Sequence, residues 1–144
     1  MSDEKDQIAL MQKAASKYAN SGNCLIIANQ ILRMCTNYDN LIKPLVATMS
    51  EGSFQELALD MMAFSILRNL MERHDTYKVL DSEAFVSKEL RNLTEFTALF
   101  YKSFPEVDLL PLMTYILNRM KTDHCHETIV LSRIMQAMFG WRDL

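Results

Sequence analysis

Apolar residues recur along this chain with the period of an α-helix. The clearest stripe follows the i, i+3, i+4, i+7 spacing of one helix face and comprises Leu109, Leu112, Met113, Ile116, Leu117 and Met120. An equally regular stripe comprises Cys24, Leu25, Ala28, Ile31, Leu32 and Cys35. The alternation of apolar and polar residues that is typical of strands is missing. The pattern therefore predicts an all-α fold.

The stripes and their flanking residues predict about seven helices, over residues 3–20, 23–35, 39–50, 54–73, 83–103, 109–122 and 126–139. Ser53 and Glu56 have the spacing of a capping box at the start of the fourth helix. Asp108 is a candidate N-cap for the sixth, and Gly140 is expected to end the seventh. The longest connection, residues 73–80, is the expected hinge.

The predicted helix over residues 54–73 is apolar on two sides. Leu57 and Met61 belong to one stripe, and Met62 and Ile66 belong to the other. Such a helix is expected to lie between neighbours, as in stacked antiparallel helix pairs. We therefore expect a short HEAT-like or armadillo-like α-solenoid, although successive pairs show no clear repeat period.

Length and composition suggest one domain over residues 1–144. A chain of this length can bury one ordinary core, and 49% of its residues are hydrophobic, as in a globular protein. Apolar runs are too short and interrupted to cross a membrane, and the acidic, polar start does not resemble a secretory signal. The three cysteines, an odd number, suggest reduced thiols in a reducing compartment.

The candidate metal ligands are His124, Cys125 and His126, which could bind zinc together with a distant Cys24 or Cys35. Structural zinc usually requires two ligand pairs with characteristic spacing, and this trio lacks the second pair. The sequence also lacks a Gly-rich phosphate loop and a nucleophile elbow. We expect no metal site, no cofactor and no catalytic residue; a metalloenzyme would require bound metal in the purified protein.

The charge balance argues against autonomous RNA binding. Lys and Arg number 15 against 18 Asp and Glu, which gives a formal net charge of −3, whereas phosphate-binding modules are basic. The basic residues are scattered and predict solvated helix faces. The methionines are abundant and adaptable, so they could fill the core or line a docking groove, and core filling is the expected role.

Three ordered motifs carry a family resemblance. The first is Tyr38-Asp39-Asn40-Leu41-Ile42-Lys43-Pro44-Leu45-Val46, and the second is Phe100-Tyr101-Lys102-Ser103-Phe104-Pro105-Glu106-Val107-Asp108-Leu109. The third is a helix carrying Leu112, Tyr115, Asn118, Met120 and Lys121. Together they resemble an internal section of the subunit 2 family of the nuclear THO complex.

The resemblance implies a section of a long, non-catalytic nuclear scaffold in the THO/TREX complex. That complex couples transcription to messenger RNA packaging, processing and export. The implied partners are other THO/TREX subunits and an RNA helicase, with messenger RNA contacted indirectly and no membrane. Phe139 and Trp141 depart from the family pattern, and we expect these aromatics to contact a protein partner. The alternative is a generic cytosolic HEAT-like adaptor.

Overall fold

The helical periodicity of the sequence is realised in the computed structural model, which describes residues 2–18, 22–81, 87–122 and 127–140. The α-helices are α1 Ser2–Tyr18, α2 Cys24–Asn37, α3 Ile42–Thr48, α4 Glu56–Glu72, α5 His74–Asp81, α6 Lys88–Ser103, α7 Leu110–Thr122 and α8 Thr128–Phe139. A 3₁₀ turn, η1 (Asp39–Leu41), precedes α3, and a π-helical turn, η2 (Met49–Ser53), follows it. These residues contain no strand, so the all-α prediction is confirmed.

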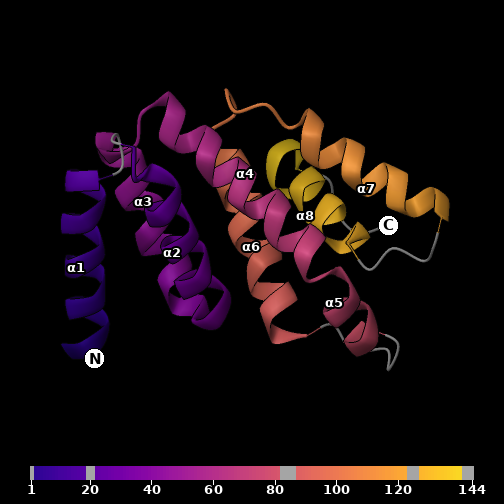
Figure 1. The fold of residues 1–144 in the computed structure, drawn as a ribbon, viewed down its shortest axis with the longest axis horizontal. Helices are drawn as coiled ribbons and strands as arrows, with labels where there is room; N and C mark the ends of the chain where they lie inside the picture. Colours follow the sequence, from indigo (N-terminus) through magenta and orange to yellow (C-terminus); the bar gives the residue numbers. More distant parts are fainter. Residues whose placement is uncertain (1, 19–21, 82–86, 123–126, 141–144) are drawn as a thin grey trace.

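Helix α6 lies at the centre of the arrangement. Figure 1 shows α1, α2 and α3 at one end of the longest axis and α7 at the other, with α4 and α6 between them. Helix α6 packs against α2, α3 and α8, and α2 also packs against α4. Nine residues of α6 are buried, and they face more than one side: Leu90, Asn92, Leu93, Thr94, Phe96, Thr97, Ala98, Phe100 and Tyr101. The stacking of antiparallel pairs stays a prediction.

The described part of the chain contains one more helix than the sequence predicted. Residues 73–80, expected to form a hinge, belong largely to α5. His74 and Tyr77 are buried in this helix, with 5% and 1% of their surface exposed. The Tyr77 hydroxyl donates to Asn69 Oδ1 at 2.8 Å, and the Arg73 guanidinium lies 5.1 Å from the centre of the tyrosine ring. Tertiary contacts therefore order a segment whose polar composition suggested a connection.

Helix α4 is not enclosed on both sides, in contrast to the prediction from its two apolar stripes. Its buried face comprises Ala58, Leu59, Met62, Ser65, Ile66 and Leu70. Leu57, Phe64 and Met71 are exposed. The enclosed helix is α6.

Helix ends follow the expected chemistry in two of three predicted cases. Asp108 Oδ1 accepts a hydrogen bond from the Leu110 backbone N–H at 2.9 Å. Gly140 ends α8 in the left-handed conformation, with φ of 68°. The capping box is wrong, because Ser53 lies in η2 and the N-cap of α4 is Gln55, which makes no side-chain capping bond.

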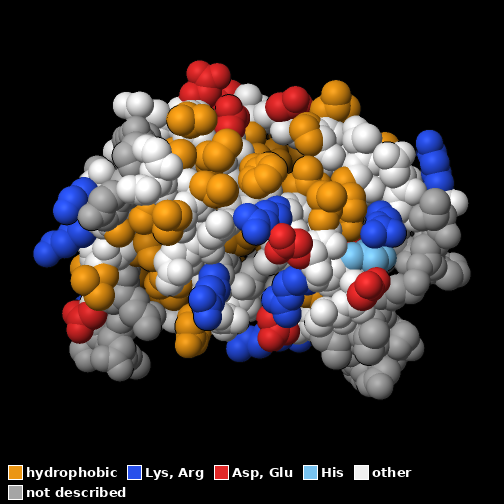
Figure 2. All heavy atoms as spheres, in the orientation of Figure 1, with side chains coloured by type: hydrophobic (Ala, Val, Ile, Leu, Met, Phe, Trp, Pro, Cys, Tyr) orange, Lys and Arg blue, Asp and Glu red, His pale blue; other side chains and the backbone are white. Residues whose placement is uncertain are grey.

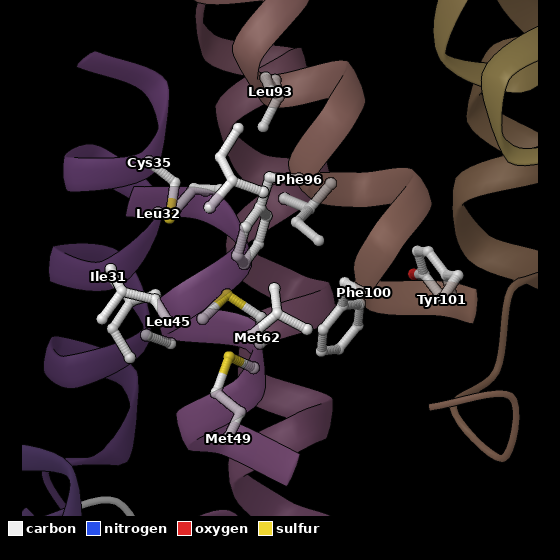
Figure 3. Close-up of a cluster of buried hydrophobic side chains, with 14 of the residues drawn as sticks. Ile31, Leu32, Cys35, Leu45, Met49, Met62, Leu93, Phe96, Phe100 and Tyr101 are labelled. Carbon is white, nitrogen blue, oxygen red and sulfur yellow. The ribbon is translucent and has the colours of Figure 1, made fainter. Parts of the chain in front are cut away.

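The main core forms where α2, α3 and α4 meet α6. Figure 3 shows Ile31, Leu32 and Cys35 of α2 close to Phe96 and Phe100 of α6, with Met62 of α4 between them. A buried hydrogen bond also joins two of these helices: Asn92 Nδ2 of α6 donates to the Thr36 carbonyl oxygen of α2 at 2.9 Å. Burial of apolar side chains from four helices therefore holds the two halves of the chain together. None of the described helices is long and apolar enough to cross a membrane.

Cys35 should resist alkylation in the folded protein. The residue is fully buried, and this burial raises the pKa of its thiol to about 12, so the reactive thiolate is scarce at mildly alkaline pH. We expect iodoacetamide to label Cys35 slowly in native buffer and completely in urea, as measured by peptide mass spectrometry. Rapid, stoichiometric labelling of Cys35 under native conditions would contradict this packing.

Candidate protein-docking face

The side of α4 opposite the core carries a row of large apolar side chains. Leu57, Phe64 and Met71 have 56%, 50% and 55% of their surface exposed. Each is seven positions further along the chain than the one before. Seven positions are close to two helical turns, so the three side chains lie on one face of the helix. A row with this spacing is the pattern by which helices pack against other helices. The structure thus presents a helix-packing surface with no helix of the described chain upon it.

Helix α7 adds a second group of exposed apolar residues, Leu110, Leu117 and Met120. The Tyr115 hydroxyl of α7 donates to the Leu70 carbonyl oxygen of α4 at 3.4 Å, which places the middle of α7 beside the end of α4. Figure 2 shows apolar side chains gathered across the part of the surface where α4 lies in Figure 1, and beside the start of α7. We call the six residues Leu57, Phe64, Met71, Leu110, Leu117 and Met120 the α4–α7 face. Single exposed apolar residues are ordinary, whereas a gathered set marks a contact surface.

Arginines border this face on the side of α2. A groove of about 420 Å³ between α2 and α4 is lined by polar side chains that include Arg33, Arg68 and Arg73. Arg68 Nε donates to Glu72 Oε1 at 2.7 Å, and both side chains are about half exposed. An apolar centre with a polar, arginine-containing rim is the usual anatomy of a protein interface.

A separate polar cluster is buried where α5, α7 and α8 meet. His74 Nδ1 lies 2.6 Å from Glu127 Oε1, and the Tyr115 hydroxyl donates to the same oxygen at 3.1 Å. Burial raises the pKa of Tyr115 to about 12, so its hydroxyl keeps its proton and remains a donor at neutral pH. His74 and Glu127 are 5% and 0% exposed, which gives a dissolved substrate no access to them. The cluster therefore joins helices and does not present reactive groups.

The residues that the sequence proposed as sites are only partly described. Phe139, at the end of α8, has 58% of its surface exposed. Trp141 and the trio His124, Cys125 and His126 lie outside the described residues. Cys24 and Cys35 are buried on α2. Within the described residues, no group of three His, Cys, Asp or Glu side chains could hold a metal ion.

Comparison with known proteins decides the family. A family model described as "Transcription- and export-related complex subunit" matches residues 16–94, which is more than half of the chain. The chain belongs to this family. THO complex subunit 2 from Homo sapiens, Mus musculus and Rhinolophus ferrumequinum is 25% identical to it over 136 residues. The alignment covers 94% of this chain but 8% of each relative, so the chain spans a small part of their length. No solved structure matches the chain.

Membership of the transcription- and export-related complex subunit family confirms the resemblance predicted from the sequence motifs. The first motif, Tyr38 to Val46, lies within the matched residues. The apolar residues of this motif are buried in the core, namely Leu41, Ile42, Leu45 and Val46. Packing therefore accounts for the apolar residues at these positions. The polar members Asp39, Asn40 and Lys43 are exposed. In this family member the motif therefore supplies both core and surface.

The sequence contained a signal for the α4–α7 face that the prediction missed. Leu57 was assigned to a buried stripe because α4 is apolar on two sides, yet Leu57, Phe64 and Met71 form a separate row at intervals of seven residues. Met71 and Met120 are exposed, whereas Met62 is fully buried. The methionines therefore divide between the core and the surface, as the two alternatives allowed.

Proposed function

We propose that this chain is a non-catalytic helical scaffold segment of a nuclear THO/TREX complex that couples transcription to messenger RNA packaging, processing and export. The observation that carries the proposal is the exposed α4–α7 face in a member of the transcription- and export-related complex subunit family. A scaffold needs surfaces that bind other proteins, and this face has the apolar row and the polar rim of such a surface. The proposal needs neither a catalytic residue nor a cofactor.

The mechanism is geometric. A segment that holds other THO/TREX subunits and an RNA helicase close to a nascent transcript raises their effective concentration. Messenger RNA is reached through these partners, because the chain has a formal net charge of −3, whereas modules that bind phosphates on their own are usually basic. A generic cytosolic HEAT-like adaptor would use the same kind of face, but family membership favours the nuclear complex.

The occupant of the α4–α7 face is an amphipathic helix of a partner subunit. The spacing of Leu57, Phe64 and Met71 fits a helix whose own apolar residues repeat every three or four positions. Arg33, Arg68 and Arg73 favour acidic residues along the edge of that helix. Phe139 and Trp141 stay our prediction for a second contact at the far end of α8.

Replacing Phe64 with aspartate should weaken capture of THO subunits by roughly tenfold or more, because central aromatic residues dominate the binding energy of interfaces. The measurement is copurification of identified THO subunits from nuclear extract with the chain as bait. Leu10→Asp is the matched control, since Leu10 is 68% exposed on α1, at the opposite end of the arrangement from α7. Equal capture by the Phe64→Asp protein, or equal loss with Leu10→Asp, would contradict the proposal; circular dichroism should show unchanged helicity in both.

A further inference from the structure

A second surface, on other elements than the α4–α7 face, is hollowed along α6. Two cavities of about 570 and 520 Å³ adjoin there and share Asp39, Glu95, Arg133 and Gln136 in their linings. Their walls come from three parts of the chain: η1 with the start of α3, the side of α6, and α8. We call this continuous depression the α6 groove. It runs from Lys88, at the start of α6, to Lys102, near its end.

The α6 groove is positively charged in a chain whose formal net charge is −3. Five cations line it, namely Lys43, Lys88, Arg91, Lys102 and Arg133. Among the residues that the structure describes, two carboxylates, Asp39 and Glu95, lie between them. Glu95 is already engaged, because it accepts from Arg133 Nε at 2.9 Å and from its Nη2 at 3.2 Å. The remaining cations, which are exposed, create a local positive potential that favours an anionic ligand.

The cations are concentrated toward the two ends of the groove. Lys88 and Arg91 lie in one cavity, and Lys43 and Lys102 lie in the other. A rise of about 1.5 Å per residue places Lys88 and Lys102 about 21 Å apart along α6. An extended peptide covers that distance with about six residues. The groove therefore suits a short extended segment with carboxylates toward both ends.

The lining between the charges favours a peptide over a nucleic acid. Apolar side chains of Ile42, Leu99, Ile129 and Ala137 contribute to the walls and can accept apolar side chains. No aromatic residue occurs in the lining of either cavity over the described residues, whereas single-stranded nucleic acids usually stack their bases on aromatic rings. The carboxylates of Asp39 and Glu95 would also repel a continuous row of phosphates.

The middle of the groove is ordered by the extensive packing of α8 against α6. The exposed Arg133–Glu95 pair spans the same two helices. A groove whose floor is already ordered requires little rearrangement on binding, which favours affinity. The same geometry exposes cations on both sides of the pair to an incoming chain.

We propose that the α6 groove binds an extended, acidic peptide segment of a partner protein, with carboxylates that reach the cations at both ends and apolar residues between them. This inference does not rest on the α4–α7 face, which comprises different residues. The cations of the α6 groove would then act together in binding one ligand, although they are dispersed in the sequence.

The test is fluorescence anisotropy with a labelled nine-residue peptide in which Glu and Leu alternate. The double variants Lys88→Glu/Arg91→Glu and Lys43→Glu/Lys102→Glu reverse the charge at one end each. Each should weaken binding by about tenfold or more, because close charge pairs at an interface contribute strongly to specificity. The matched control is Lys5→Glu/Lys13→Glu on α1, which makes the same change in net charge at exposed positions and should leave binding within about twofold.

Two further probes separate the proposal from other ligands. A peptide with Gln in place of Glu should bind at least about tenfold more weakly, since it lacks the carboxylates. A ten-nucleotide single-stranded RNA should bind more weakly than the acidic peptide. Tighter binding of the RNA, equal binding of the Gln peptide, equal loss with the α1 variant, or no binding of the acidic peptide would each overturn the inference. The Phe64→Asp variant should bind the peptide normally, so failure of the α4–α7 face and failure of the groove are distinguishable.

Discussion

Phe96→Ala should lower the free energy of unfolding by about 3–5 kcal/mol, the range measured for truncating a buried aromatic residue. Phe96 is fully buried on α6, and its ring is stacked with that of Phe100 at 6.2 Å between centroids. Figure 3 shows its side chain pointing toward Leu32 and Met62, which belong to α2 and α4. Its removal leaves a cavity where three helices meet, and the packed surroundings can fill such a cavity only partly.

The measurement is urea unfolding followed by circular dichroism, with Phe64→Ala as the matched control. Phe64 has the same side chain but is 50% exposed on the α4–α7 face, so its truncation should cost less than about 1 kcal/mol in the isolated chain. A similar loss in both variants would mean that α6 is not the centre of the core. It would also mean that the face of α4 is covered within this chain.

Helical periodicity predicted most of the fold because burial along α2 and α7 is one-sided and apolar. Ile31 and Cys35 on α2, and Leu112 and Ile116 on α7, are buried as their stripes predicted, whereas Leu117 and Met120 of the α7 stripe are exposed. Helix α5 escaped prediction because its buried residues, His74 and Tyr77, carry polar groups, and the partner of His74 is Glu127, 53 residues further along the chain. The sequence around α5 does not indicate such a distant partner.

The surfaces were harder to predict than the core. The two apolar stripes of α4 predicted that both sides of the helix would be packed against other helices. They did not indicate whether the second of these helices belongs to the same chain. Lys43, Arg91 and Arg133 are far apart in the sequence and suggested separate solvated faces. The packing of α3, α6 and α8 brings them into one groove. Charge clusters assembled by tertiary structure in this way do not show in composition.

Replacing Glu127 with alanine should cost about 1–3 kcal/mol, because it removes a buried hydrogen-bond partner that two side chains share. Glu127 is fully buried beside His74, at 2.6 Å, and beside the hydroxyl of Tyr115, at 3.1 Å. Without the carboxylate, His74 loses a hydrogen-bond partner in the interior, while the partly buried Tyr115 keeps the Leu70 carbonyl oxygen as an acceptor. The contacts of α5 and α7 with the start of α8, where Glu127 is the N-cap, should loosen together.

The matched control is Glu72→Ala, which removes the partner of Arg68 from a pair whose side chains are 49% and 61% exposed. Solvent screens that pair, so its loss should change the free energy of unfolding by about 0–1 kcal/mol. A double-mutant cycle with His74→Leu and Glu127→Met then measures the interaction free energy between His74 and Glu127. We expect a coupling of about 1–3 kcal/mol, since His74 and Glu127 are in direct contact and the double replacement removes both members of the pair. Additive losses in the cycle would show that His74 and Glu127 act separately, and that burial of α5 depends on Tyr77 and its bond to Asn69 instead.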